Sequence, residues 1–110
     1  MKKFGDVKGK IHRLRELLPI EEQLAQLAEE AAELSFAALK YRRALSCKNP
    51  TPLTEEEALE LLKEEVSDVI QCIDVIGILD DTDQLVETLA MQNAKYDRWI
   101  ERIESGRCGR

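Results

Sequence analysis

The fold of this chain is decided by two long stretches, residues 19–46 (PIEEQLAQLAEEAAELSFAALKYRRALS) and residues 54–79 (TEEEALELLKEEVSDVIQCIDVIGIL). In both, apolar side chains recur at intervals of three and four residues, which is the period of an α-helix and not the alternation of a β-strand. The segment between them, residues 48–53 (KNPTPL), contains two prolines and an asparagine. Such a segment is typical of a loop. The sequence therefore predicts two long helices joined by a proline-containing loop.

Local signals mark the ends of these helices. Pro19 suits a first-turn position because it has no backbone N–H to leave unpaired. Thr54 and Glu57 have the spacing of a capping box, in which each side chain bonds the other's backbone N–H. The basic residues Arg42 and Arg43 stand where they complement the negative end of the helix dipole.

Two further helices are predicted at the flanks. Residues 7–18 carry one apolar stripe and stop before a proline, and residues 85–104 follow a turn at residues 80–82. The fourth helix is expected to end at the Ser-Gly pair at 105–106, and residues 105–110 are expected to be a frayed tail. The predicted fold is all-α, a helix bundle with two long motif-bearing helices and two shorter flanking helices. Because the long helices are apolar over more than half their circumference, we expect oligomerisation to complete the bundle.

Composition restricts the class of protein. The 110 residues are 44% hydrophobic and 35% charged, with five Gly and three Pro, which fits one folded helical domain spanning residues 1–110. The formal net charge of −6 disfavours a nucleic-acid polymer as partner, because such binding depends on Lys and Arg neutralising phosphates. No apolar stretch is long enough to cross a membrane. No signal peptide is evident, so a cytoplasmic location is expected.

The three cysteines, at positions 47, 72 and 108, are an odd number with no Cys-x-x-Cys spacing, and the chain has one histidine. Reduced thiols are therefore expected, and a zinc site is not.

Acidic residues interrupt the apolar surfaces of both long helices. Glu30 and Glu33 on the first, and Glu65 and Asp68 on the second, stand three residues apart and point in the same direction. Burying several carboxylates together is costly, so a cation is expected between them. Hard divalent cations accept such oxygen ligands, and the absence of a Glu-x-x-His pair argues against a di-iron centre. The four acids thus predict a Mg²⁺ site, with Mn²⁺ as the alternative metal. The competing interpretation is that they are rim residues of amphipathic helices, satisfied by lysines and water.

The motifs Glu29-Glu30-Ala31-Ala32-Glu33 and Glu65-Val66-Ser67-Asp68 resemble the EExxE and ExxD motifs of the MazG-like, all-α nucleoside triphosphate pyrophosphohydrolases. The resemblance covers most of the chain and includes the helix lengths, the loop and a basic fourth helix. It implies hydrolysis between the α- and β-phosphates to a monophosphate and pyrophosphate. It also implies Mg²⁺ held by the motif acids, a dimer or tetramer, and a role for Glu29 in orienting or deprotonating the attacking water.

The fourth predicted helix offers candidate contacts to substrate phosphates. Lys95 and Arg98 lie three residues apart, and an arginine is suited to a bidentate grip on phosphate oxygens. Asn93 is a further polar candidate. The alternative interpretation is that Lys95 and Arg98 balance neighbouring acids on a solvated face and that Asn93 faces water.

Two functions from other classes compete with the enzyme. One is a catalytically silent helical interaction module, in which the acids are solvated and the apolar surfaces mediate assembly. The other is a nucleotide sensor that keeps the metal site without turnover.

Overall fold

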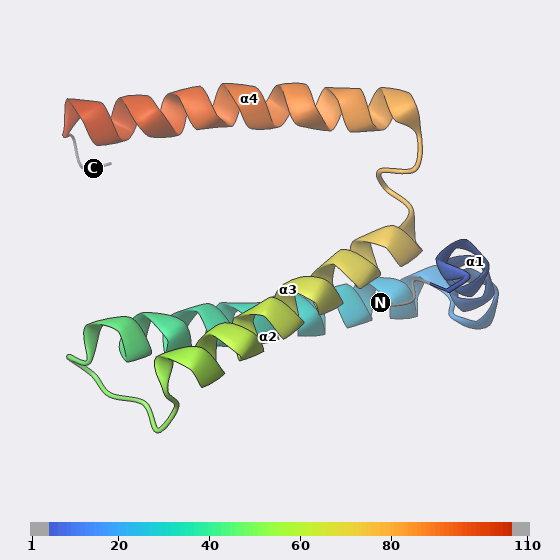
Figure 1. The fold of residues 1–110 in the computed structure, drawn as a ribbon. Helices are drawn as coiled ribbons and strands as arrows, with labels where there is room; N and C mark the ends of the chain where they lie inside the picture. The colour runs from blue at the N-terminus through green and yellow to red at the C-terminus, as the bar shows by residue number, and fades with distance from the viewer. Residues whose placement is uncertain (1–4, 107–110) are drawn as a thin grey trace. The chain divides into compact units, whose positions relative to one another are not determined.

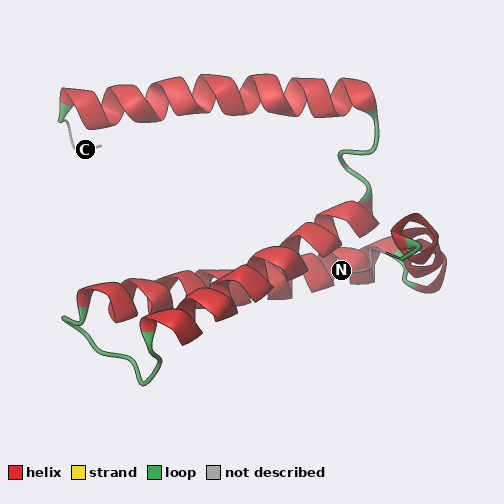
Figure 2. Ribbon diagram, viewed as in Figure 1, coloured by secondary structure: helices red, strands yellow, loops and turns green. Residues whose placement is uncertain are grey.

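The structure of this protein is a computed structural model that describes residues 5–106 (Figure 1). Within these residues it has four α-helices and no β-strand (Figure 2). The helices are α1 (Val7–Leu17), α2 (Ile20–Ser46), α3 (Glu55–Ile76) and α4 (Thr82–Ser105). The prediction of an all-α chain is confirmed.

Helices α2 and α3 form an antiparallel hairpin and lie side by side along much of their length (Figure 1). Helix α2 ends at Ser46, and its C-cap Cys47 has a left-handed conformation with φ of 55°. Helix α3 begins at the predicted capping box: the Glu57 N–H donates to Thr54 Oγ1 at 3.1 Å, and the Thr54 N–H donates to Glu57 Oε1 at 3.0 Å. Pro19 is the N-cap of α2 and not a residue of its first turn, so the helix begins at Ile20.

The predicted lengths of the last two helices need correction. Helix α3 ends at Ile76 and not near residue 79, because Gly77 has φ of 81°, a left-handed conformation that glycine adopts at little cost. Helix α4 begins earlier than predicted, because the Asp81 side chain caps it by accepting from the Asp83 N–H at 2.8 Å. With 24 residues against 22 in α3, α4 is not a short flanking helix.

The C-terminal end of α4 lies where the sequence indicated, with Gly106 as a left-handed C-cap at φ of 66°. Ser105 belongs to the helix, contrary to the expected fraying from that residue. The remainder of the predicted frayed tail, residues 107–110, lies outside the described residues.

Helix α1 packs against the C-terminal part of α3. Arg15 donates from Nε to the Val75 carbonyl oxygen at 2.8 Å and from Nη2 to the Asp74 carbonyl oxygen at 2.7 Å. These carbonyls lie in the last turn of α3, where helical backbone oxygens have no partner within the helix. Arg15 thus links α1 to the last turn of α3.

The core consists of small side chains. Its buried apolar members are Ala37, Ala44, Ala58 and Cys72, and no large side chain is fully buried among the described residues. The chain divides after Gly77 into two compact units. The second contains α4, which has no buried residue. One domain across residues 1–110 stays a prediction. No helix in the described range is long and apolar enough to span a membrane.

The capping box gives a test of how α3 begins. Thr54→Ala removes one hydrogen bond of the box and should lower the free energy of unfolding by about 1 kcal/mol. Urea denaturation measures this change. Thr54→Ser keeps the hydroxyl and should recover most of the loss, whereas equal losses in both variants would contradict a capping role.

Candidate metal centre

Three carboxylates converge between the two helices of the hairpin. Glu30 and Glu33 come from α2 and Glu65 comes from α3, and one carboxylate oxygen from each lies within 4.8 Å of the other two. The spacing of three residues directs Glu30 and Glu33 to adjacent positions on α2. The packing of α3 then brings Glu65 to them. The described atoms therefore include a set of oxygen donors able to surround one hard cation.

Two oxygens of this group are buried without a donor from outside it. Glu30 Oε2 and Glu65 Oε2 have no hydrogen-bond partner among the described atoms while both carboxyls are ionised, and a hydrogen bond between the two carboxyls forms when Glu65 carries a proton. Burial raises the pKa of Glu30, and the negative charges of Glu33 and Asp68 raise it further. Burial likewise raises the pKa of Glu65, with added repulsion from Glu33, Asp68 and Glu30. Without a cation, full ionisation of these carboxyl groups is therefore electrostatically unfavourable.

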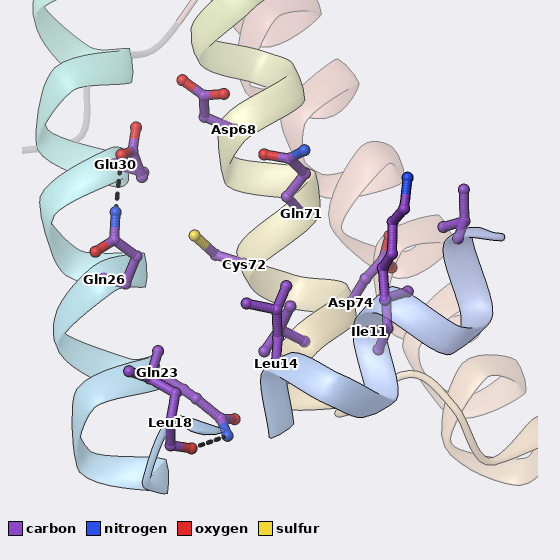
Figure 3. Close-up of a pocket in the computed structure, with 13 residues that line it drawn as sticks. Ile11, Leu14, Leu18, Gln23, Gln26, Glu30, Asp68, Gln71, Cys72 and Asp74 are labelled. Carbon is purple, nitrogen blue, oxygen red and sulfur yellow. Dashed lines mark hydrogen bonds between the residues drawn. The ribbon is translucent and has the colours of Figure 1, made fainter. Parts of the chain in front are cut away.

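Asp68, the fourth predicted ligand, belongs to the same electrostatic group. Its charge acts on both Glu30 and Glu65, and it lines a cavity together with Glu30 (Figure 3). It is not one of the three residues whose oxygens converge.

Gln26 is a site residue that the sequence analysis missed. Its Nε2 donates to Glu30 Oε1 at 3.1 Å, and this hydrogen bond lowers the pKa of Glu30, against the larger effect of burial (Figure 3). The two residues stand four apart, a spacing at which Gln and acidic side chains meet on a helix. That spacing is the signal that could have found Gln26.

A cavity of about 570 Å³ adjoins the acids and is walled by α1, α2 and α3 (Figure 3). Glu30 and Asp68 stand at one end of it, and Leu14 of α1 helps to form the other. Its remaining surface combines aliphatic side chains with the carboxamides of Gln23, Gln26 and Gln71. The charged side chains of Lys10 and Asp74 also line it. Gln23 is buried and donates from Nε2 to the Leu18 carbonyl oxygen at 2.8 Å. The sequence analysis did not predict this cavity, because α1 reaches it only through its packing on α3.

Cys72 lies on the cavity wall, and its thiol points toward α2 (Figure 3). Burial raises its thiol pKa, and the charges of Glu30 and Asp68 act in the same direction. Cys47 is a free, exposed thiol, and Cys72 is free as well. Cys108 lies outside the described residues.

Of the other predicted site residues, Glu29 does not join this group in the structure. Glu29 is exposed on α2 and is not among the residues that line the cavity. Asn93, Lys95 and Arg98 are exposed on α4, which belongs to the second compact unit. Their roles stay predictions.

A scan against protein-family models, a search of curated proteins and a search of solved structures each found no match to this chain. The resemblance to MazG-like enzymes therefore depends on the motif residues themselves.

The raised pKa of Glu65 predicts a pH dependence of stability in the presence of chelator. When the folded-state pKa of a carboxyl lies above its ordinary value of 4.5, the folded protein binds the extra proton. The stability contributed by that proton is complete below the ordinary pKa and is lost as the pH rises through the folded-state pKa. Glu65→Gln should reduce this loss, as measured by urea denaturation across a pH series.

Glu64→Gln is the matched control, because Glu64 is the adjacent residue and is exposed. It should leave the pH dependence of wild type unchanged. Identical pH profiles for Glu65→Gln and wild type would contradict the electrostatic description of the site.

Proposed function

We propose that this protein is a Mg²⁺-dependent nucleoside triphosphate pyrophosphohydrolase of the MazG-like family. The observation that carries the proposal is the convergence of Glu30, Glu33 and Glu65 within 4.8 Å, with two buried oxygens that have no partner while Glu30 and Glu65 are ionised. Glu33 is exposed, but Glu30 and Glu65 are half-buried, so ionising both is costly unless a cation lies beside them. It favours the metal-site interpretation over the rim-residue interpretation.

In this proposal Glu30, Glu33, Glu65 and Asp68 hold Mg²⁺, or Mn²⁺ in its place. Carboxylate oxygens from two facing helices are the donor set from which helix bundles build metal centres. When bound, such an ion polarises phosphoryl oxygens and neutralises the charge of a leaving pyrophosphate. Gln26 orients Glu30 through its 3.1 Å hydrogen bond, as partners of metal ligands do.

The cavity beside the acids supplies room for the rest of the substrate. Its end at Glu30 and Asp68 suits a metal-bound triphosphate, and its aliphatic and carboxamide lining suits a flat group with polar edges. A nucleoside triphosphate has both a triphosphate and a flat base with polar edges. The carboxamides of Gln23, Gln26 and Gln71 present donors and acceptors without adding charge.

The proposed roles of the remaining residues follow from the sequence motifs and from the charge of their side chains. Glu29 corresponds to the first glutamate of the EExxE motif and is proposed to orient or deprotonate the attacking water. Lys95 and Arg98, with Asn93, are proposed to bind phosphate oxygens, because cationic and amide donors suit them. The protein is proposed to act in the cytoplasm as a homodimer or homotetramer, with neither a membrane nor a nucleic-acid polymer as partner.

Metal binding is tested through stability, without knowledge of the substrate. A ligand that binds only the folded state must stabilise it, so Mg²⁺ at ~5 mM should raise the wild-type thermal midpoint above its value in chelator. Asp68→Asn should melt no lower than wild type in chelator, because it relieves repulsion. It should also lose most of the Mg²⁺-induced rise, whereas Glu64→Gln should keep it. A Mg²⁺ response that survives in Asp68→Asn would remove this residue from the site.

The reaction is tested by its products. Incubation with a panel of nucleoside triphosphates and Mg²⁺, without added inorganic pyrophosphatase, should release a monophosphate and pyrophosphate. Glu30→Gln should lower kcat/KM roughly 100-fold or more, since loss even of a group behind a metal ligand costs about 10- to 100-fold. Orthophosphate and a diphosphate as the main products would contradict the assignment. Metal and nucleotide binding without turnover would instead favour a sensor.

A further inference from the structure

Gln23 is the one polar residue that is buried in the described chain, and it lines the cavity beside the acids. It stands near the start of α2 and is 7% exposed. Its Nε2 donates to the Leu18 carbonyl oxygen at 2.8 Å, in the corner between α1 and α2 (Figure 3). No other hydrogen bond to this carboxamide forms among residues 5–106. The oxygen Oε1 and the second N–H of Nε2 are therefore left for another partner.

These two groups open into the cavity. Among the buried and half-buried residues of the described chain, the side-chain oxygens that lack both solvent and a partner belong to Glu30 and Glu65. Gln23 Oε1 is not one of them, so a molecule in the cavity can reach it although the residue as a whole is buried. A buried amide with open hydrogen-bonding groups is satisfied only by water or by a ligand.

The Leu18 carbonyl fixes which way this carboxamide points. A free glutamine can turn its carboxamide by half a turn, which exchanges the oxygen with the nitrogen. If Gln23 did so, Oε1 would face the Leu18 carbonyl oxygen, and two acceptors would meet without a donor. Gln23 therefore presents its oxygen to the cavity as a fixed acceptor. The exposed Gln71 has no such anchor among the residues that line the cavity (Figure 3).

The distance from Gln23 to the acids is about the length of a nucleoside. Gln23 precedes Glu30 by seven residues, which is about 10 Å along a helix, and the two stand on nearly the same side of α2. Figure 3 shows Gln26 between them, bonded to Glu30. A phosphate held at the acids would thus place the far edge of a base near Gln23, where Leu14 and Leu18 offer aliphatic surface to its flat sides.

We propose that Gln23 selects nucleotides whose base carries an amine at the position farthest from the sugar, which are those of cytosine and adenine. Oε1 accepts from this amine, and the second N–H of Nε2 donates to the ring nitrogen beside it. Uracil and hypoxanthine carry an oxygen at that position, next to a ring N–H, so their oxygen would face Oε1. This inference rests on the proposed function for the class of ligand, and it names the substrates within that class.

A fixed acceptor discriminates between bases by the groups that it leaves unpaired. With the wrong base, Oε1 and the base oxygen oppose each other inside the cavity, and neither finds a donor. A site built to hydrogen-bond one polar group of a substrate rejects the analogue that lacks it far more strongly than an apolar pocket does. We therefore expect a preference of roughly tenfold or more for cytosine over uracil, and for adenine over hypoxanthine.

The test uses free nucleosides, which carry no phosphate and therefore need no metal. Cytidine and uridine, and then adenosine and inosine, are titrated into the full chain while NMR spectra record its backbone and side-chain amides. Wild type should bind the amine-bearing member of each pair roughly tenfold or more tightly. Gln23→Met, which keeps the side-chain length and removes both polar atoms, should bind the two members alike. Gln71→Met is the matched control in the same cavity and should keep the wild-type preference, whatever its effect on the affinity for both members.

Equal binding of the two members by wild type, or binding of neither, would overturn the inference. A preference that survives in Gln23→Met would also overturn it, because another acceptor, such as the exposed Asp74 carboxylate on the cavity wall, would then read the amine. Loss of the preference in Gln71→Met as well as in Gln23→Met would show that Gln23 is not the selecting residue.

A second measurement changes the ligand and leaves the protein intact, in case Gln23→Met loses the helical signal in far-UV circular dichroism. Purine riboside is adenosine without the amine. It should bind wild type less tightly than adenosine, because one hydrogen bond is lost, but more tightly than inosine, whose oxygen would face Oε1. Binding as tight as that of adenosine would overturn the inference.

These outcomes are separable from those that test the proposed function. Selective binding of nucleosides without hydrolysis of any triphosphate would keep the role of Gln23 and remove the enzyme. Hydrolysis of ATP and inosine triphosphate with equal kcat/KM would keep the enzyme and overturn selection by Gln23.

Discussion

Repulsion among the carboxylates of Glu30, Glu33 and Glu65 is the constraint on which the remainder of the hairpin depends. Like charges held this close in a partly buried setting oppose folding unless a proton or a cation accompanies them. The helices nevertheless approach closely, because Ala37 and Ala58, only 1% and 0% exposed, lie between them. Small residues at the contact thus hold the acids within 4.8 Å of one another. The repulsion among these carboxylates therefore lowers the stability of the fold at the place where the proposed chemistry needs negative charge.

The two sides of the hairpin differ in chemistry: one carries Glu33 and Asp68, and the other carries Val66 and Ile70. On the acidic side, Arg15 attaches α1 to the last carbonyls of α3, and α1 then closes one wall of the cavity. On the other side, apolar residues remain exposed although the helices are well formed. A core built of three alanines and a cysteine buries little apolar surface, so this fold needs further contacts to be stable. The proposed metal would supply some of that missing stability, because a ligand that binds only the folded state stabilises it.

Helix α4, in the second unit, also lacks buried apolar contacts. It begins at a side-chain cap and ends at a glycine, yet none of its residues is buried. Helices of this kind derive most of their stability from packing of an apolar side, which in α4 includes Leu89, Tyr96 and Trp99, all more than half exposed. The proposed phosphate contacts of Lys95 and Arg98 depend on where this helix packs.

The sequence by itself determined the features that depend on local chemistry. Helical periodicity predicted all four helices, the Thr54–Glu57 spacing predicted a capping box that forms, and Gly106 ends α4 as expected. The i, i+3 spacing also identified Glu30 and Glu33, because neighbours on one helix turn are set by the helix itself. Local signals failed where two of them competed: Gly77 ended α3 before the apolar pattern ended, and Asp81 started α4 before that helix's pattern began. The tertiary structure alone decided which acids of the two helices converge and that α1 helps to form the wall of a cavity. Those features depend on how far apart two helices pack and in what register, and both are set by contacts between residues distant in the chain.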